Sequence, residues 1–364
     1  MSYFKMLQCV VVLLLMVSTA WACTGLRVIA EDGAVVVGRT MEFGFDVQSD
    51  AAVVPVGTQL TSSLTDSRAS FSYRVEHGFV GANAMGRRVV ADGVNERGLY
   101  VGAHYFPGYA GYVELTDENA DRALAPEDYA TWLLAGFASV EEVRAHFADV
   151  VLVGNPIEEI GGIAAPLHFV VHDASGASIV IEPVDGELTL HENPLGVFTN
   201  SPGFDWHMTN LNNYMNLTAT NVPQFELGNA VWLQQFGQGT GMRGLPGDFT
   251  PPSRFVRAVA YSQSAETLAT AEPTVKQVFH IMNAFDIPRG AVQDVHDDGV
   301  HLDYTVWTSV ADLQNRRWLF RTYNDQTIRS IDVREALAAA GDQIRLIEMD
   351  SAQPIDDVST RFTP

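Results

Sequence analysis

Ala20-Trp21-Ala22-Cys23-Thr24-Gly25 is the stretch of sequence on which the fold assignment rests. The segment before it has a lysine at position 5 and an apolar run over residues 10–17, and two alanines precede the cysteine in the A-x-A pattern of a signal-peptidase site. This pattern predicts a secretory signal over residues 1–22, a single folded domain over residues 23–364, and Cys23 as the N-terminal residue of the mature protein.

Cleavage at that position would give Cys23 two reactive groups. The chain has two cysteines, and Cys9 lies in the predicted signal, so no disulfide can form within the mature chain. A free thiol and a free α-amino group would make one residue both nucleophile and base. Two other interpretations stay open: a lipidated cysteine, although Ala20 and Trp21 differ from the usual lipoprotein signal, and a cysteine buried as a small apolar side chain.

The composition is that of a packed and acidic globular protein. Hydrophobic residues make up 47% and aromatic residues 10% of the 364 residues, which argues against disorder. Lys and Arg total 22 against 44 Asp and Glu, and no basic cluster offsets the net charge of −22, so we expect no nucleic-acid partner. No apolar run after residue 22 is long enough to cross a membrane, so we expect an exported protein, periplasmic or secreted, without a membrane span.

Two apolar runs next to the cysteine predict a β-hairpin. Residues 26–30 and 34–41 flank a turn and are rich in β-branched side chains. The second run is apolar on both faces until Arg39, and a buried charge needs a partner. We therefore expect Arg39 to lie close to Cys23, with Glu42 farther along the same strand.

The rest of the chain alternates between strands and helices. The same criteria predict strands at residues 51–56, 70–75, 88–91, 100–104, 167–172, 178–182, 187–191, 304–310 and 318–323. Apolar spacings of three and four predict helices that begin near residue 126, cover 140–147, 205–217 and 275–285, and start at a Ser253 cap. With no linker or internal repeat, this order favours one α+β domain with helices outside packed sheets.

The chemistry that these residues allow is acyl transfer to water through a cysteine. Cysteine attacks as a thiolate, the α-amino group of Cys23 can accept its proton, and Arg39 and Arg254 would favour the negative charge. The amide of Asn200, in the motif Thr199-Asn200-Ser201-Pro202, is suited to stabilise the oxyanion of a tetrahedral intermediate.

The remaining motifs carry weaker signals. One candidate metal cluster consists of His296, Asp297, Asp298, His301 and Asp303. Its spacing matches no zinc pattern, and neither common phosphate-binding glycine motif occurs, so we expect no metal and no cofactor. Asn216-Leu217-Thr218 is a glycosylation sequon, which is a frequent chance match.

Taken in order, the motifs resemble the choloylglycine hydrolases, which include penicillin V acylases and conjugated bile salt hydrolases, within the N-terminal nucleophile (Ntn) hydrolase fold. The motifs are Cys23-Thr24, Gly38-Arg39-Thr40-Met41-Glu42, Asn95-Glu96-Arg97-Gly98-Leu99, Thr199-Asn200-Ser201-Pro202, Pro246-Gly247-Asp248 with Ser253-Arg254-Phe255, and Tyr304-Thr305-Val306-Trp307-Thr308. None is decisive alone, but their common order over residues 23–330 is specific.

The resemblance implies a four-layer αββα sandwich and an acyl-cysteine mechanism. The catalytic residues that it implies are Cys23, Arg39, Glu42, His104, Asn200 and Arg254. Glu42 stands where the family usually has Asp, and one more methylene lengthens its reach to the amine. His104 follows the Asn95–Leu99 turn, where the family places its second oxyanion donor, contributed by either the backbone or the side chain.

The resemblance also implies a small-molecule amide substrate and a homotetramer. An exported form looks like the Gram-negative branch, whose members are similar to penicillin V acylases and often hydrolyse long-chain N-acyl homoserine lactones. The side chains expected to line an acyl pocket are Met41, Phe45, Tyr105, Phe106 and Tyr109, although aromatic residues suit an ordinary core equally well. The rival functions are a conjugated bile salt hydrolase, another lipid-amide hydrolase, and a ligand-binding lipoprotein anchored at Cys23.

Overall fold

The computed structural model of the protein describes residues 22–296 and 299–361. The predicted signal before Ala22 lies outside the described residues, as do Asp297 and Asp298. Within the described ranges, no helix has both the length and the apolar character needed to cross a membrane.

The first of two large sheets carries the N-terminal hairpin. Its strand order is β1-β2-β19-β20-β21, all antiparallel, and β18 pairs with β19. The strands are β1 (Cys23–Ile29), β2 (Val35–Phe43), β18 (Val292–His296), β19 (Gly299–Asp312), β20 (Arg317–Thr322) and β21 (Arg329–Asp332). Strands from both ends of the chain therefore meet beside Cys23.

The second sheet has the strand order β15-β14-β13-β8-β7-β6-β3-β22. These strands are β3 (Asp50–Val54), β6 (Phe79–Asn83), β7 (Val90–Asn95), β8 (Tyr100–Tyr105), β13 (Leu167–His172), β14 (Ser178–Val184), β15 (Glu187–Glu192) and β22 (Arg345–Glu348). Each central strand is buried along nearly its whole length, as expected for a sheet covered on both faces.

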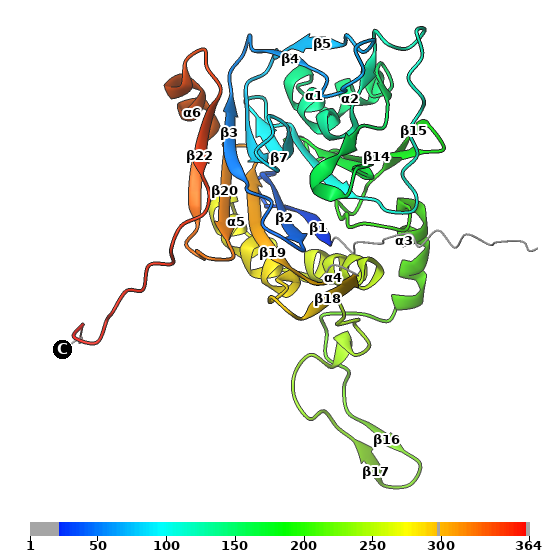
Figure 1. Ribbon diagram of the computed structural model, residues 1–364. Coiled ribbons are helices and arrows are strands. Elements are labelled where there is room, and N and C mark those ends of the chain that lie inside the picture. Colours follow the sequence, from blue (N-terminus) through cyan, green and yellow to red (C-terminus); the bar gives the residue numbers. More distant parts are fainter. Residues whose placement is uncertain (1–21, 297–298, 362–364) are drawn as a thin grey trace, which may run out of the picture.

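Helices cover the outer face of each sheet (Figure 1). α4 (Pro251–Ser264) and α5 (Ala271–Met282) pack on β1 and β2, whereas α1 (Tyr129–Gly136) packs on β7 and β8. The other helices are α2 (Val140–His146), α3 (Phe204–Asn210) and α6 (Val333–Ala340), with 3-10 turns at η1 (Pro126–Asp128), η2 (Glu158–Ile160), η3 (Leu211–Tyr214), η4 (Thr240–Met242) and η5 (Asn283–Phe285). The predicted αββα sandwich is confirmed.

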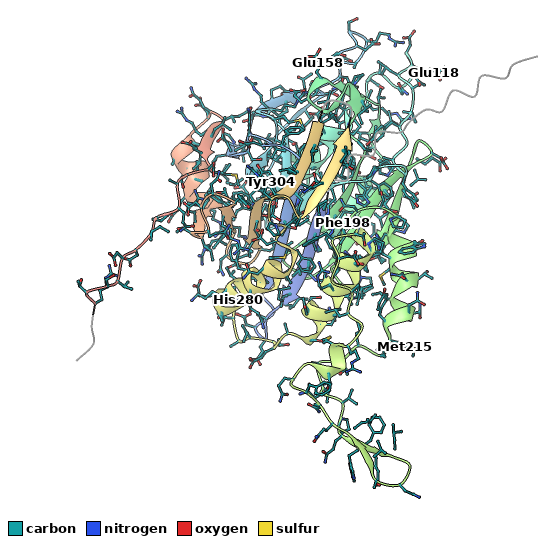
Figure 2. The ribbon with its side chains drawn as sticks, turned by 60° about the horizontal axis from the view of Figure 1, so that its bottom comes forward. Glu118, Glu158, Phe198, Met215, His280 and Tyr304 are labelled. Carbon is teal, nitrogen blue, oxygen red and sulfur yellow. The ribbon has the colours of Figure 1, made fainter. Side chains whose placement is uncertain are left out.

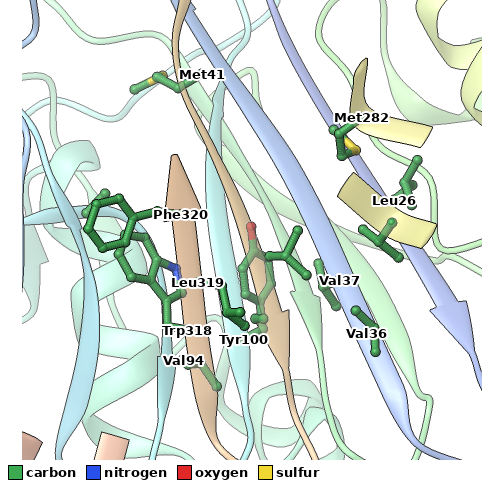
Figure 3. Packing of buried hydrophobic residues seen from close by; sticks show 14 of the residues in the cluster. Leu26, Val36, Val37, Met41, Val94, Tyr100, Met282, Trp318, Leu319 and Phe320 are labelled. Carbon is green, nitrogen blue, oxygen red and sulfur yellow. The ribbon is translucent and has the colours of Figure 1, made fainter. Parts of the chain in front are cut away.

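Two apolar clusters hold the four layers together. The first joins both sheets and α5, and Figure 3 shows Val37 and Leu319 from the first sheet together with Tyr100 from the second. The second lies between the second sheet and helices α1 and α2. Cys23 belongs to the first cluster, so the candidate nucleophile sits at the inner face of the sandwich rather than on its surface.

Close packing of α5 on the first sheet depends on a glycine. A Cβ atom at Gly38 would lie 2.4 Å from Val278 Cγ1 and 3.1 Å from Met282 Cγ, both on α5. Such distances are far below van der Waals contact. The helix can therefore approach β2 one residue away from Arg39 only because position 38 has no side chain.

The helix that carries Arg254 begins earlier than the sequence indicated. α4 starts at Pro251 after a Thr250 cap, so Ser253 lies in its first turn instead of capping it. Proline is favoured at the first helical position because its fixed φ suits the helix and its missing N–H is not needed there. The shift moves Arg254 to the fourth residue of the helix.

A small hairpin projects from the body of the molecule (Figures 1 and 2). It consists of β16 (Phe225–Leu227) and β17 (Val231–Leu233), and every residue of both strands is exposed. Strand signals there were missed because no buried face imposes a clear alternation. The remaining short strands are β4 (Gln59–Thr61), β5 (Ser72–Arg74), β9 (Ala123–Leu124), β10 (Val151–Leu152), β11 (Pro156–Ile157) and β12 (Ile163–Ala164).

Candidate active site

The register of the N-terminal hairpin brings Cys23 and Arg39 together, as the sequence predicted. Cys23 pairs with Met41 and Gly25 pairs with Arg39 across β1 and β2. Arg39 Nη2 lies 3.6 Å from Cys23 Sγ, and Met41 Sδ lies 3.8 Å from the same sulfur. The thiol is therefore buried in direct contact with a guanidinium.

Arg39 is completely buried and fixed by the second sheet. Its Nη2 donates to the Ala103 carbonyl oxygen at 2.7 Å, and its Nη1 donates to the carbonyl oxygen of Ala91. Asp92, next in sequence to that anchor, is the buried carboxylate whose charge faces Arg39. Burial raises the pKa of Asp92 above its usual value, and the charge of Arg39 opposes that rise.

Asp92 is itself held by hydroxyl donors. Tyr100 Oη donates to Asp92 Oδ2 at 3.1 Å, and Ser309 Oγ donates to the same oxygen. Tyr100 lies on β8 and Ser309 on β19, so both sheets contribute to this contact. The arrangement supplies Arg39 with a counter-charge beneath the thiol.

Arg254 is a second buried guanidinium, and it connects three segments of the site. Its Nη2 donates to Asn200 Oδ1 at 2.7 Å, its Nη1 donates to Thr24 Oγ1 at 2.9 Å and to the carbonyl oxygen of Cys23, and its Nε donates to the Phe249 carbonyl oxygen at 2.8 Å. Burial lowers the pKa of Arg254 to about 10, and the charge of Glu42 opposes that change. Arg254 therefore stays cationic at neutral pH and binds backbone and amide oxygens rather than the thiol.

The Asn200 amide lies directly beside the nucleophile. Its Oδ1 accepts from the Cys23 backbone nitrogen at 2.8 Å as well as from Arg254, and its Nδ2 donates to the Tyr105 carbonyl oxygen at 2.8 Å. These partners fix the amide orientation, because Oδ1 faces two donors and Nδ2 faces an acceptor. An amide nitrogen carries two hydrogens, so one remains for a substrate oxygen.

Glu42 is completely buried near the N-terminal end of β1. Its Oε1 accepts from Thr305 Oγ1 at 3.1 Å, and its backbone N–H donates to the Ala22 carbonyl oxygen at 3.0 Å. Burial raises the pKa of Glu42 to about 8, although the charges of Arg254 and Arg39 pull it down. Since Ala22 is still joined to Cys23 in this chain, the Cys23 nitrogen is a peptide N–H here.

Cys23 opens onto a cavity with about 650 Å³ of empty space, its open mouth included. The residues that line it are Cys23, Arg39, Met41, Glu42, Phe43, Ala84, Met85, Arg87, Val89, Val90, Ala91, Ala103, Tyr105, Glu127, Ile157, Ala165 and Leu167. Most of these side chains are apolar, so the cavity suits an apolar acyl group.

Only part of the expected acyl-pocket lining faces this cavity. Met41 and Tyr105 line it, whereas Phe45, Phe106 and Tyr109 do not. Phe45 is partly exposed and packs edge-on against Phe43 with ring centroids 4.5 Å apart. Phe106 and Tyr109 stack on each other beyond the end of β8, with centroids 5.3 Å apart.

His104 also points away from the cavity. Side chains alternate along a strand, and Tyr105 is the neighbour on β8 that lines the cavity with Cys23. The His104 ring instead packs 4.7 Å from the Phe198 ring, and its Nδ1 lies 2.8 Å from the Thr199 carbonyl oxygen. Its side chain is therefore not placed to contact an oxyanion in this cavity, and of the two contributions that the resemblance implied at this position only that of the backbone stays a prediction.

Three residues that contact the candidate catalytic side chains were not predicted from the sequence as site residues. Asp92 was not singled out in the sequence, although a carboxylate between the apolar residues Val90 and Val94 of one strand was an available signal. Thr24 and Thr305 lie within recognised motifs, but hydroxyl contacts to Arg254 and Glu42 depend on long-range packing that spacing does not encode.

No group of three or more His, Cys, Asp or Glu side chains within the described ranges is arranged to hold a metal ion. The proposed cluster near His301 includes Asp297 and Asp298, which lie outside those ranges.

Residues 23–345 match the family model for linear amide C–N hydrolases of the choloylglycine hydrolase family. The chain belongs to the choloylglycine hydrolase family. It is therefore a hydrolase that acts on carbon–nitrogen bonds in linear amides, as the resemblance implied.

Individual relatives of this family agree with the assignment. The chain is 34% identical over 312 residues to a bile salt hydrolase/transferase from Clostridium perfringens, an alignment that covers 85% of this chain and 92% of the relative. A penicillin V acylase from Pectobacterium atrosepticum is 26% identical over 82% of this chain and 77% of its own length.

Solved structures show the same architecture. A conjugated bile acid hydrolase from Clostridium perfringens superposes with a TM-score of 0.81 at 30% identity. The superposition covers 92% of this chain and 100% of that one. A penicillin V acylase from Agrobacterium tumefaciens has a TM-score of 0.72 at 23% identity over 90% of this chain and 91% of that one, which supports the shared fold.

Proposed function

We propose that this choloylglycine hydrolase is an exported enzyme that uses Cys23 as its N-terminal nucleophile against amides with an apolar acyl group. The observation that carries the proposal is the placement of Cys23 Sγ at 3.6 Å from Arg39 Nη2, at the wall of a mostly apolar cavity. A cysteine buried as a spectator would need neither the buried guanidinium nor the open space.

The reaction would proceed through an acyl-cysteine intermediate. The α-amino group of Cys23, freed by removal of residues 1–22, takes the thiol proton, and the sulfur attacks the amide carbonyl carbon. The second N–H of Asn200 Nδ2 stabilises the resulting oxyanion, a contribution of about 3 kcal/mol for this kind of donor. The C–N bond breaks as the amine leaves with the proton, and water then attacks the thioester to release the acid and restore the thiol.

Penicillin V and long-chain N-acyl homoserine lactones are the first substrates to test, because a phenoxyacetyl or fatty acyl group would fit the apolar lining. Cys23→Ser and Cys23→Ala should each lose more than 99% of turnover, about the effect of removing a nucleophile. Equal hydrolysis by wild type and both variants would refute the mechanism. A Met85→Leu variant, which keeps an apolar side chain of similar volume, serves as the matched control.

Conjugated bile salts are the second candidate substrates, favoured by the 34% identity to a bile salt hydrolase/transferase. The same wild-type preparation assayed on glycine and taurine conjugates, penicillin V and acyl homoserine lactones separates the two by their kcat/KM values. Preference for the steroid conjugates would replace the first candidate without changing the role of Cys23.

Export is proposed from the pattern of residues 1–22 alone, and the location would be periplasmic or secreted. Intact-mass measurement of the protein recovered from outside the cytoplasm should give a chain that begins at Cys23 with an unmodified thiol and amine. A diacylated N-terminus would instead favour the ligand-binding lipoprotein, since lipidation removes the nucleophile.

The projecting hairpin supports a self-associating enzyme, proposed here as a homotetramer. Its exposed apolar side chains are Phe225, Leu227, Val231, Trp232, Leu233 and Phe236, and such a patch on a projecting element is typical of a protein contact. Light scattering should give a tetramer for wild type and a smaller species for Trp232→Glu. A monomeric wild type would contradict the proposal.

A further inference from the structure

Three buried histidines surround the backbone of the segment that carries Asn200. His104 Nδ1 lies 2.8 Å from the Thr199 carbonyl oxygen, and His168 Nε2 lies 3.3 Å from the same oxygen. His207 Nε2 lies 2.8 Å from the carbonyl oxygen of Asn200 itself. The carbonyls on both sides of the Asn200 Cα atom therefore each face at least one imidazole.

The direction of these hydrogen bonds follows from the acceptors. A carbonyl oxygen only accepts, so His104 Nδ1 and His207 Nε2 must each carry the hydrogen. Burial holds the pKa of His104 well below its usual value and lowers the pKa of His207 to about 4. Both rings are therefore neutral near pH 7 and have one hydrogen each, which these bonds use.

The other ring nitrogen of each histidine has no bond that competes with the one to the Asn200 segment. His104 Nε2 and His207 Nδ1 are buried and have no hydrogen-bond partner among the described residues. A neutral imidazole that donates from one nitrogen keeps a lone pair on the other, and leaving it buried without a donor costs free energy. Both histidines therefore have one unsatisfied ring nitrogen and one that is bonded to the Asn200 segment.

Aromatic side chains prevent the rings from turning. The His207 ring stacks on Phe255 with centroids 4.7 Å apart and an interplanar angle of 15°. Phe198, in the interior beside the first sheet (Figure 2), packs 4.7 Å from His104 and 4.2 Å from His168. The donors are thus fixed in direction as well as in distance.

His168 extends this support to a buried carboxylate. Its Nδ1 lies 3.2 Å from Glu182 Oε1, and Phe204 N donates to the same oxygen at 3.0 Å. His191 Nε2 lies 3.4 Å from Glu182 Oε2 on the other side. Glu182 therefore links β14 to the start of α3, the helix on which His207 lies.

We propose that His104 and His207 are positioning residues that hold the Asn200 amide in place by donating hydrogen bonds to the Thr199 and Asn200 carbonyl oxygens. The inference rests on the proposed role of Asn200 as an oxyanion donor. It accounts for the buried histidine at this position of β8, although His104 does not line the cavity. Misplacement of a catalytic group by a fraction of an ångström lowers kcat rather than substrate affinity.

A double-mutant cycle tests the proposal on the secreted full-length enzyme. His207→Phe keeps a ring against Phe255 but removes the donor, and we expect kcat to fall by about tenfold to a hundredfold with KM within about twofold. His207→Gln retains an N–H donor and should recover at least half of the lost activity. In an Asn200→Ala background, His207→Phe should cause less than about a twofold further loss, because both changes remove the same function.

The matched control is Tyr129→Phe, which also removes a buried side-chain donor to a backbone carbonyl, at 2.7 Å from the Phe147 oxygen in the second apolar cluster. It should lower stability while kcat stays within about twofold. Full effects of His207→Phe in the Asn200→Ala background, or no rescue by Gln, would overturn the positioning role. Full activity of Asn200→Ala alone would instead overturn the proposed oxyanion donor.

If the His207 variants do not fold, the same cycle with His104→Phe and His104→Gln decides the matter. The rate of Cys23 alkylation by iodoacetamide confirms that the nucleophile is intact in each variant. A loss of kcat with normal alkylation is expected, whereas equal losses of both would show that the histidines support the fold in general and would refute the inference.

Discussion

Replacing Arg254 by lysine tests the central contact of the site. The guanidinium donates to the Phe249 and Cys23 carbonyl oxygens, to Thr24 Oγ1 and to Asn200 Oδ1. These acceptors lie around a planar group with three separate nitrogens. A lysine ammonium has one nitrogen, so it cannot reach the Phe249 and Asn200 oxygens at the same time.

The expected cost follows from the lost bonds. A hydrogen bond to a charged group contributes about 1.5–3 kcal/mol, and we expect Arg254→Lys to lose two of the four. The free energy of unfolding should therefore fall by roughly 3–6 kcal/mol. Release of Asn200 Oδ1 should also lower kcat by about a hundredfold, the cost of a misplaced catalytic group.

The variant should also acquire a steeper pH dependence. Burial brings the pKa of Arg254 to about 10, and lysine starts from an ordinary value about two lower than arginine. The lysine cation would be lost as the pH rises above neutrality, whereas Arg254 keeps its charge. Activity of Arg254→Lys should thus decline between pH 7 and about 9, while the wild type shows no decline from this group.

Arg257→Lys is the matched control for this experiment. Arg257 lies on the same helix, is buried, and donates through Nη1 to the Pro246 and Asp248 carbonyl oxygens at 2.8 and 3.0 Å. Urea unfolding and steady-state kinetics on penicillin V should show that it loses stability but keeps kcat within about twofold. The reasoning is refuted if Arg254→Lys keeps its kcat, or if both lysine variants lose it equally.

Three further perturbations follow from the same contacts. Asp92→Asn weakens the hydrogen bonds from Tyr100 and Ser309 and should cost about 1.5–3 kcal/mol in urea unfolding, the contribution of a hydrogen bond to a charged group; an unchanged midpoint would contradict that role. Because Glu42 has its pKa raised from 4.5 to about 8, its contribution to stability is present below pH 4.5 and is lost as the pH rises through 8, so Glu42→Gln should reduce the decline in unfolding free energy between pH 5 and 8 by about 2–4 kcal/mol. Gly38→Ala should cost about 1–3 kcal/mol by forcing α5 from β2, and an equal thermal midpoint for both proteins would show that α5 shifts freely.

The layers of the fold and part of the site could be predicted because their signals are local. The hairpin around Arg39 follows from two short apolar runs. Its turn sets the register of the two strands, and this register places Met41 across from Cys23. The order of strands and helices indicated one α+β domain with helices outside packed sheets, and the family resemblance implied the four-layer αββα class. The observed ends of helices differ from the predicted ones where a single residue favours another boundary, as Pro251 does at the start of α4.

Contacts between distant segments could not be predicted from spacing. Asp92 and Ser309 are 217 positions apart, and only the stacking of the two sheets brings them together. The family resemblance implied that His104 contributes to the oxyanion site by its backbone or its side chain, and alternation along β8 places the Tyr105 side chain, not that of His104, at the cavity. A one-residue uncertainty along a strand changes the face on which a side chain lies.

The two buried arginines have different tasks, and their partners show why one cannot replace the other. Arg39 is anchored to carbonyl oxygens of the second sheet and presents Nη2 to the sulfur. Arg254 donates through Nε to the carbonyl oxygen of Phe249, just before α4, and its other nitrogens donate to Asn200 and to the backbone of Cys23. The first therefore contacts the thiol that we propose as nucleophile, whereas the second fixes the amide that would receive the oxyanion in the proposed mechanism.

The two arginines also have different buried carboxyls near them. Asp92 faces Arg39 at the inner end of the site, and Glu42 lies nearer to Arg254, whose charge is the strongest of those that lower its pKa. A buried carboxylate without an opposite charge nearby would destabilise the fold. Glu42 Oε1 accepts from a hydroxyl and Oε2 has no hydrogen-bond partner among the described residues, so in the proposed mechanism Oε2 is left for the amine that cleavage before Cys23 would create.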